Sequence, residues 1–241
     1  MIETGDRILL CGSGREYYQK AGAGRLETDL GYIDLESIIG LSEGDTVLSH
    51  KGVAFLLRIP RPPDHFAHLR RSGAPMLPKD IGYVIGATGM NRNDIVLDAG
   101  TGSGIAAVYF GGIAKEVVTY EKRPEFASIA AENMKEAGLS NVEVIARDIL
   151  DATGKFDIVH LDMMLEPVHI QHAYGLLKEG GFFASYTPFL EQTFTVIETA
   201  RSLFSHVNTY ECIERELSRS SRGTRPSTRV GHSGYITIAR K

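Results

Sequence analysis

The stretch from Asp94 to Gly104 constrains the fold of this chain more than any other. It begins with the apolar run Ile95–Leu97, which suits a strand covered on both faces, and the run leads to Asp98. Three glycines then follow at alternate positions: Gly100, Gly102 and Gly104. Glycine lets a backbone turn tightly and brings its N–H groups close to a ligand. The stretch therefore predicts a buried strand that turns into a ligand-binding loop at its carboxyl end.

Three further apolar runs each lead to an acid, at Glu121, Asp148 and Asp162. Glu121 lies about twenty residues beyond the glycine loop, where an open α/β sheet binds a ribose diol. Because the carboxyl ends of parallel strands meet at one edge, these acids and Asp98 predict a single ligand crevice. Strand ends are polar in many sheets, which is the alternative explanation for any one of them.

The glycine loop also indicates which ligand to expect. Its sequence, Gly-Thr-Gly-Ser-Gly, lacks the Gly-x-Gly-x-x-Gly spacing of a pyrophosphate site and the Gly-Lys-Ser/Thr of a P-loop. S-adenosylmethionine contains an adenosine but no phosphate, so we expect it as the cofactor.

From residue 94 onward, strands and helices alternate, which predicts a Rossmann-like, doubly wound α/β domain over 94–241. We expect a strand over 142–148 and another over 182–186. We expect helices over 124–138, over 167–178 with Gly180 and Gly181 closing it, and over 191–203. An antiparallel hairpin should pair 207–213 with 234–239.

The region before residue 94 reads differently. Short apolar stretches between glycine and aspartate turns predict a small β domain over 1–62. Residues 63–93 are expected to form a helical linker. Its first helix should begin at Asp64 as N-cap and reach about Arg71, and its second should begin at Pro78.

Length and composition exclude several classes of protein. The chain has 241 residues and no apolar run near the roughly 18 of a membrane span, and its start lacks the features of a signal peptide. We therefore expect no membrane association and a cytoplasmic location. Cys11 and Cys212 lack a metal-ligand spacing, so we expect reduced core thiols and no metal, with a disulfide as the minority alternative.

Basic residues are segregated along the chain although the net charge is −4. Residues 201–241 contain eight Lys and Arg against three acids. Residues 219–233, expected to form a loop, contain four arginines and no acid, and a second basic stretch lies over 58–79. Such stretches suit RNA phosphates, and a solvated charged face is the alternative. The candidate RNA contacts are Arg219, Arg222, Arg225, Arg229, Arg70 and Arg71.

Several motifs together resemble the class I tRNA (adenine-N1)-methyltransferase family, which modifies the T-loop adenosine. The resemblance covers nearly the whole chain. It rests on Pro78-Lys-Asp80, Asp98–Gly104, Tyr120–Ala127, Asp162 with Glu166-Pro167, Tyr186-Thr-Pro188 with Gln192, and the ending Arg225–Lys241 that includes Gly231-His-Ser-Gly-Tyr235.

The resemblance implies a role for each matching position. The glycine turn would cradle the methionine part of S-adenosylmethionine, Glu121 would hold the ribose, Asp148 the adenine amino group and Asp162 the target base. The residues expected to bind cofactor are Asp98, Gly100, Thr101, Gly102, Ser103, Gly104, Glu121, Lys122, Arg123, Asp148, Ile149 and Asp162. The implied substrate is tRNA at position 58, with position 57 left open, and the implied assembly is a homotetramer.

Two departures from the family pattern fall in the expected base pocket. Leu77 stands where the family has an aromatic residue before Pro-Lys-Asp. The segment Asp162–Val168 is one residue longer than the family motif and lacks its tryptophan.

Two residues are the catalytic candidates. Asp162 would accept the N–H of adenine and stabilise the developing cation. Tyr186 would stack on the base or donate a hydrogen bond to it, with a core tyrosine as the alternative. Adenine N1 already carries a lone pair and needs no general base, so His232 is expected in a structural turn or a subunit contact. His160 is expected to be a satisfied core residue.

Two other functions remain open from the sequence. One is a methyltransferase for protein or small-molecule carboxylates, which would share the glycine turn but would not need the arginine-rich stretch. The other is a non-catalytic RNA-binding subunit of a methyltransferase complex, against which the intact acids argue.

Overall fold

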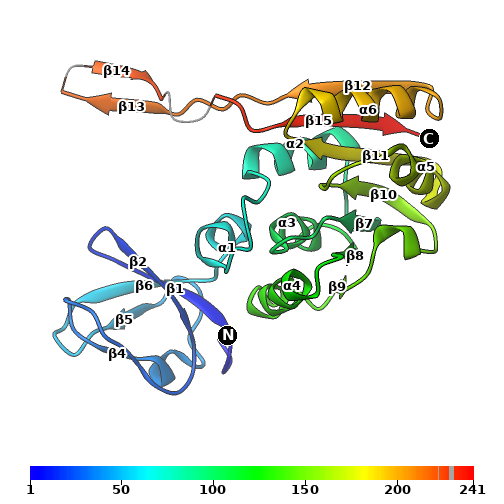
Figure 1. The fold of residues 1–241 in the computed structure, drawn as a ribbon. Helices are drawn as coiled ribbons and strands as arrows, with labels where there is room; N and C mark the ends of the chain where they lie inside the picture. Colours follow the sequence, from blue (N-terminus) through cyan, green and yellow to red (C-terminus); the bar gives the residue numbers. More distant parts are fainter. Residues whose placement is uncertain (222, 228–230) are drawn as a thin grey trace. The chain divides into compact units, whose positions relative to one another are not determined.

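The structure is a computed structural model of the chain and describes residues 1–221, 223–227 and 231–241 (Figure 1). The chain forms two compact units. Unit 1 comprises Met1–Leu69 with Met134–Leu139, and unit 2 comprises Arg70–Asn133 with Ser140–Lys241. In the described ranges, no helix is both long and apolar enough to cross a membrane.

Unit 1 contains the predicted N-terminal β-sheet. Its four antiparallel strands lie in the order β2-β1-β6-β5, and their bounds are Arg15–Lys20, Arg7–Gly12, Ala54–Arg58 and Thr46–Leu48. Strands β3 (Arg25–Leu26) and β4 (Ile33–Asp34) form a second small sheet, followed by the 3-10 helix η1 (Leu35–Ile38). The side chains of Ile8, Leu10, Phe55 and Leu57 are fully buried in the core of this unit.

The expected linker of residues 63–93 is divided between the units: α1 (Pro62–His68) belongs to unit 1 and α2 (Pro78–Thr88) to unit 2. The prediction that Asp64 caps α1 is wrong, because Arg61 is the N-cap. Asp64 instead occupies the third helical position, and its carboxylate accepts a hydrogen bond from the backbone N–H of Arg61 at 2.7 Å. The first-turn prolines lack N–H groups and therefore fit the start of the helix.

Unit 2 is built on a seven-stranded sheet in the order β12-β15-β11-β10-β7-β8-β9. Strands β7 to β11 run parallel, and β15 is antiparallel to both β11 and β12. This topology confirms the predicted α/β domain and its closing hairpin. The bounds are β7 (Ile95–Ala99), β8 (Glu116–Tyr120), β9 (Val142–Ile145), β10 (Phe156–Leu161), β11 (Leu177–Thr187), β12 (His206–Glu211) and β15 (Tyr235–Arg240).

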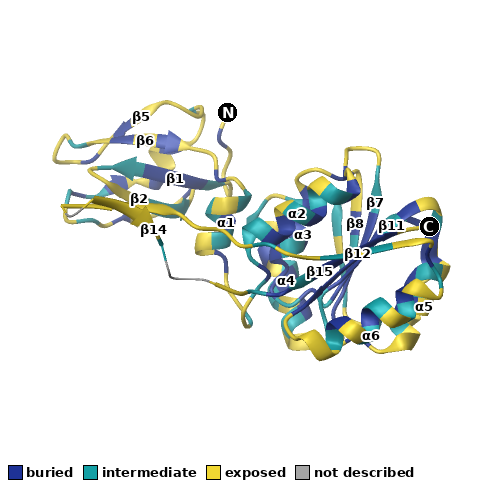
Figure 2. Ribbon diagram, turned by 90° about the horizontal axis from the view of Figure 1, so that it is seen from above, coloured by how far each residue is buried: buried dark blue, intermediate teal, exposed yellow. Residues whose placement is uncertain are grey.

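Helices cover both faces of this sheet. Figure 2 shows α2, α3 (Ile105–Gly111) and α4 (Pro124–Glu136) on one face, and α5 (Pro167–Leu176) and α6 (Leu190–Arg201) on the other. Apolar side chains of the central strands are therefore buried on both sides, as Val96, Leu97 and Val159 show by their complete burial. Two-sided burial explains why the sequence of β7 is a continuous apolar run.

Two predicted boundaries of this unit are wrong. Gly180 and Gly181 do not close a helix, because α5 ends at Leu176 and both glycines lie within β11. The register between β10 and β11 shifts at this point, which places the glycines in an irregular part of the strand. Strand β9 ends at Ile145, so Asp148 follows it as the N-cap of the 3-10 helix η2 (Ile149–Asp151).

The stretch 219–233 is not wholly a loop. Strands β13 (Leu217–Ser220) and β14 (Gly223–Pro226) pair as a separate antiparallel hairpin in which every residue is exposed. Arg219 and Arg225 belong to this hairpin, whereas Arg222 and Arg229 lie outside the described residues.

Candidate active site

The glycine turn after β7 lies against the loop after β10. Gly100, Gly102 and Gly104 have φ angles of +83°, +55° and +81°, in the left-handed region that favours glycine. A Cβ on Gly100 would stand 1.9 Å from the backbone carbonyl oxygen of Asp162. No other residue type allows the two backbones to approach this closely, and the backbone N–H of Asp162 donates to the carbonyl of Ala99 at 2.8 Å.

The two loops meet where the strand order of the sheet reverses, between β7 and β10. Open α/β sheets bind ligands at such a switch point, outside the carboxyl ends of the strands. Two hollows of about 240 and 440 Å³ lie here, and both are lined by Gly100, Arg123 and Asp162. The predicted crevice is therefore present in unit 2.

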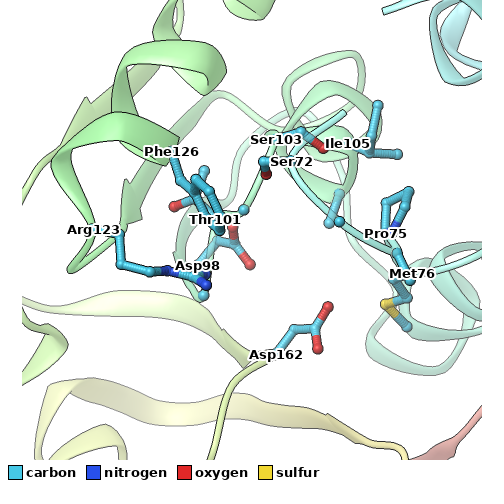
Figure 3. A pocket seen from close by; sticks show the side chains of 15 residues that line it. Ser72, Pro75, Met76, Asp98, Thr101, Ser103, Ile105, Arg123, Phe126 and Asp162 are labelled. Carbon is cyan, nitrogen blue, oxygen red and sulfur yellow. The ribbon is translucent and has the colours of Figure 1, made fainter. Parts of the chain in front are cut away.

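The smaller hollow lies over the glycine turn (Figure 3). Its wall includes Asp98, Thr101, Gly102 and Ser103, with Phe126 from α4 beside Arg123. The segment Ser72–Met76 lines it from the side opposite α4 and brings an apolar Met76 and Pro75 to the wall. Gly104 does not line either hollow; it is buried as the N-cap of α3.

The larger hollow lies at the ends of β8 and β9. It is lined by Glu121, Lys122, Asp148 and Ile149, and by Met163 and Met164 after β10. Of the expected cofactor residues, this hollow therefore gathers those assigned to the ribose and the adenine. Acidic, basic and apolar side chains share its wall, and the bases Lys122 and Arg123 are paired with Asp148 and Glu121.

Glu121 is held ionised at the end of β8. Its carboxylate is 3% exposed and accepts hydrogen bonds from the backbone N–H of Gly102 at 2.8 Å and from the Arg123 side chain at 2.8 and 3.2 Å. Burial favours the neutral acid, but the bonds from Arg123 and Gly102 outweigh it, so the pKa of Glu121 lies below its usual value. The hydrogen bond from Gly102 thus joins the glycine turn to Glu121, the residue expected to bind the ribose.

Asp148 has a local structural role as well as a place in the hollow. Its carboxylate accepts from the backbone N–H of Leu150 at 3.1 Å and from Lys122 at 2.9 Å. These two partners lower the pKa of Asp148. Ile149 is 3% exposed and forms an apolar part of the wall beneath it.

Asp98 is buried among polar partners rather than free at the strand end. One carboxylate oxygen accepts from the hydroxyl of Thr119 at 2.6 Å, and the other lies 2.7 Å from Nδ1 of His160. His160 is fully buried, as predicted for a core residue. The prediction that it is satisfied is wrong for one atom, because no partner of its Nε2 is found among the described residues.

Asp162 differs from Glu121 in its ionisation. It lines both hollows, and burial raises the pKa of its carboxyl to about 6. His160 acts against this rise, and the negative charge of Asp98 adds to it. The crevice thus contains one carboxylate that stays ionised and one that titrates near neutrality, as pairs with divergent pKa values do at many active sites.

Tyr186 does not line either hollow. It is 9% exposed at the end of β11, and its ring lies so close to Gly234 that a Cβ there would stand 2.4 Å from the ring Cζ. Burial raises the pKa of Tyr186 to about 12. Its hydroxyl interacts with Ser233, and the charges of Asp80 and Asp162 both act on it. The geometry suits a hydrogen-bond donor better than a stacking platform.

Comparison with known proteins assigns the family. Residues 90–223 match the family described as methyltransferase domain. A tRNA (adenine(57)-N(1)/adenine(58)-N(1))-methyltransferase TrmI from Methanocaldococcus jannaschii is 32% identical over 97% of this chain and 94% of its own. The chain belongs to the TrmI family.

Two solved structures have the same fold along the whole chain. A SAM-dependent O-methyltransferase from Thermotoga maritima is 27% identical, with a TM-score of 0.84, over 100% of this chain and 94% of its own. The tRNA (m1A58) methyltransferase TrmI from Aquifex aeolicus is 24% identical, with a TM-score of 0.79, over 100% of this chain and 98% of its own. The predicted class I methyltransferase fold is confirmed.

Some features of this TrmI-family site were not predicted. No motif in the sequence predicted that Ser72–Met76 would line the smaller hollow. Asn133 of α4, which is 2% exposed, donates to the backbone carbonyls of Arg70 and Ser103 at 2.8 and 2.7 Å. It thereby joins the start of that segment to the glycine turn. A buried asparagine in an amphipathic helix was the only available hint.

The remaining predicted residues lie outside the hollows. Arg70 and Arg71 are exposed, and Arg70 lies 3.6 Å from Glu132. Leu77 is the N-cap of α2, and Val168 is 44% exposed near the start of α5. Neither Leu77 nor Val168 lines a hollow, whereas Met163, Met164 and Glu166 of the lengthened segment line the larger one.

His232 and the cysteines can also be placed. The ring of His232 is hydrogen-bonded to Glu211 at 2.6 Å and to the carbonyl of Pro188 at 3.1 Å. Both partners are acceptors, which requires a protonated ring, and the Glu211 contact raises the pKa of His232. This agrees with a structural role.

Cys11 and Cys212 are free thiols as predicted, but they are half-exposed and not core residues.

We predict that Gly100→Ala weakens cofactor binding more than its backbone strain alone would. The added Cβ would overlap the Asp162 carbonyl, so the two loops must separate, at a cost of about 2–4 kcal/mol. Calorimetric titration with S-adenosylhomocysteine and urea denaturation measure the two effects.

The matched control is Gly89→Ala. Gly89 also has a positive φ, +64°, but a Cβ there meets nothing within 4 Å. That variant should lose only about 1 kcal/mol of stability and keep its cofactor affinity. Equal losses in the two variants would show that the contact between the loops is unimportant.

Proposed function

We propose that this chain methylates N1 of an adenosine in the T-loop of tRNA, at position 58 or at both 57 and 58, using S-adenosylmethionine. The observation that carries the proposal is the position of Asp162 at the junction of the two hollows, directly against the glycine turn. The M. jannaschii relative named for both positions matches 97% of the chain, which supports the assignment of the substrate.

The side chains of the crevice fit this cofactor. Asp98, Glu121, Asp148 and Asp162 line the crevice together with the bases Lys122, Arg123 and Arg147. The glycine turn lacks the spacing of a pyrophosphate site, which favours a phosphate-free sulfonium. The glycine turn would hold the methionine part, Glu121 the ribose hydroxyls, and Asp148 with Ile149 the adenine. When bound, S-adenosylmethionine supplies an electrophilic methyl group on its sulfonium.

The residues of the chain would orient the target base rather than activate it. Adenine N1 has an in-plane lone pair, so no side chain has to remove a proton from it. Asp162 would accept a hydrogen bond from the exocyclic amino group, which selects adenine and stabilises the positive charge that the purine acquires. Alignment of the base can contribute several kcal/mol to the rate. Tyr186 would donate a hydrogen bond to the base.

The RNA would be bound by exposed arginines. Arg219 and Arg225 lie on neighbouring strands of the β13–β14 hairpin, where Ser218 pairs with Arg225 and Arg219 with Thr224. Exposed guanidinium groups contact phosphates and position an RNA without reading its sequence. Arg70 and Arg71, next to the segment that lines the smaller hollow, would extend this contact toward the site.

We further propose that the chain is a homotetramer in the cytoplasm. The outer edge of β12 pairs with no other strand of the described part of the chain and offers Tyr210, which is 40% exposed. A second copy can add to such an edge.

The runner-up function is carboxylate methylation, which the O-methyltransferase name of the T. maritima protein favours.

We predict that the purified chain, incubated with unmodified tRNA transcript and labelled S-adenosylmethionine, forms 1-methyladenosine in the T-loop. Nucleoside analysis by mass spectrometry measures the product, and a transcript with guanosine at positions 57 and 58 is the substrate control. Asp162→Ala should reduce turnover about a hundredfold or more while cofactor affinity changes only a few fold.

Two results would contradict this prediction. If the cofactor binds and no 1-methyladenosine forms, while a carboxylate substrate is methylated, the runner-up function is correct. If Asp162→Ala lowers affinity and turnover equally, Asp162 belongs to the cofactor site alone.

We predict that kcat/KM for tRNA declines below about pH 6. The carboxyl of Asp162, with its pKa raised to about 6, is protonated at lower pH and loses the negative charge that would stabilise the developing cation. The ionised fraction then falls about tenfold for each pH unit. In Asp162→Asn the residual activity should no longer decline at low pH. If kcat/KM of this variant declines at low pH as in the unaltered protein, another group causes the decline.

We predict that Arg219→Ala with Arg225→Ala raises KM for tRNA and leaves cofactor affinity unchanged. Each lost phosphate contact should reduce, by about one, the slope of the logarithm of the tRNA association constant against the logarithm of the salt concentration. Arg92→Ala is the matched control, because Arg92 is an exposed arginine of unit 2 remote from the hairpin in sequence. Equal effects in the two variants would mean that the hairpin does not bind RNA.

A further inference from the structure

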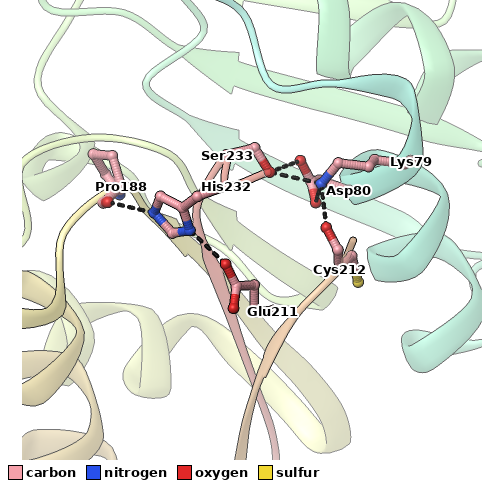
Figure 4. Close-up of polar contacts among 7 residues, drawn as sticks. All are labelled: Lys79, Asp80, Pro188, Glu211, Cys212, His232 and Ser233. Atoms are coloured by element: carbon pink, nitrogen blue, oxygen red, sulfur yellow. Dashed lines mark hydrogen bonds and ion pairs between the residues drawn. The ribbon is translucent and has the colours of Figure 1, made fainter. Parts of the chain in front are cut away.

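Two sequence motifs that the proposed chemistry does not use meet in unit 2 (Figure 4). Lys79, at the start of α2, donates hydrogen bonds from Nζ to Oδ1 of Asp80 at 2.7 Å and to Oγ of Ser233 at 2.6 Å. Its third bond goes to the backbone carbonyl of Cys212 at 2.6 Å. Segments more than 130 residues apart in sequence are therefore joined by one ammonium group.

The polar atoms of this cluster are fully paired. Ser233 donates its hydroxyl hydrogen to Oδ2 of Asp80 at 2.8 Å, so both oxygens of Asp80 are engaged. The side chain of Asp80 is fully buried and that of Lys79 is 12% exposed. A buried ion pair adds little net stability because both charges lose hydration. Its fixed geometry therefore supports a positioning role better than a role in stability.

The cluster lies where the chain enters and leaves the arginine hairpin. Cys212 precedes β13, and Ser233 follows β14. The neighbouring His232 adds a second contact between segments. Its ring is hydrogen-bonded both to Glu211 at the end of β12 and to the carbonyl of Pro188 after β11. The two ends of the hairpin segment are thus held at one place.

The same cluster reaches the catalytic candidate Tyr186. The ring of Tyr186 packs on the backbone of Gly234, directly after Ser233, and its hydroxyl interacts with Ser233. The charges of Asp80 and Asp162 both act on that hydroxyl. Ser233 therefore links the buried ion pair to a hydroxyl that lies within electrostatic range of Asp162.

We propose that Lys79, Asp80 and Ser233 are positioning residues that fix the Tyr186 hydroxyl and the ends of the β13–β14 hairpin in one arrangement. This inference rests on the proposed function. RNA held on the hairpin would then present its base to Asp162 and Tyr186 in a single geometry. The cluster acts through Tyr186 and the backbone, and it does not touch the reacting atoms.

The test is Ser233→Ala, which removes one hydroxyl and leaves the Lys79–Asp80 ion pair in place. Misplacement of a catalytic group by about 1 Å can cost up to about a hundredfold in rate, so kcat should fall about 10- to 100-fold. The KM for S-adenosylmethionine and the melting temperature should stay close to those of the unaltered protein. Ser233→Thr keeps a hydroxyl and should restore most of the rate.

Two comparisons separate positioning from a general loss of structure. Ser202→Ala removes an exposed hydroxyl at the end of α6 and should leave the kinetics unchanged. In a double-mutant cycle, Ser233→Ala should change kcat by less than about twofold once Tyr186→Phe is present, because both substitutions break the same link. If the two substitutions instead reduce kcat independently, so that their fold-changes multiply in the double variant, the proposal is overturned.

Hydrogen exchange gives a readout that does not need activity. Ser233→Ala should speed the exchange of the backbone amides of residues 231–234, with no change in β7 and β10. Unchanged exchange at 231–234 would overturn the proposal even in an active enzyme. Failure of the unaltered protein to form 1-methyladenosine would instead refute the proposed function, and the exchange result would still show whether the cluster fixes this segment.

Discussion

The contact between the backbones of Gly100 and Asp162 determines the geometry of the crevice. It brings the loops after β7 and β10 together at the point where the strand order of the sheet reverses. Because a side chain at position 100 would overlap the Asp162 carbonyl, the approach depends on glycine. Gly100 and Asp162 line both hollows, so the shape of each hollow depends on this one contact.

The acids of the crevice differ in charge because they differ in partners. Glu121 is paired with Arg123 and a backbone N–H, and it stays ionised despite its burial. Asp162 has no such ion pair in the described part of the chain, and loss of solvation raises its pKa to about 6. The electrostatics therefore distinguish an acid that stays ionised from an acid that titrates near pH 6.

Local sequence signals predicted the central fold because each could be read within one element. The apolar runs of β7 and β10, the glycine turn and Glu121 are examples, and the alternation of strands and helices followed from them. The end of α5 was predicted wrongly because glycines punctuate strands as well as helices, and Gly180 with Gly181 stands in an irregular part of β11. The Lys79–Ser233 cluster and the Ser72–Met76 wall could not be predicted, since both depend on contacts between distant segments.

The order of the strands has a consequence for how this protein is made. Strand β15, formed by residues 235–240, lies between β11 and β12 and pairs with both. Strand β12 is synthesised earlier, yet it has no neighbour in the sheet until β15 has left the ribosome. The half of the sheet that carries Tyr186 therefore closes only after β15 has been translated, and a nascent chain that ends before β15 would leave β12 unpaired in the sheet.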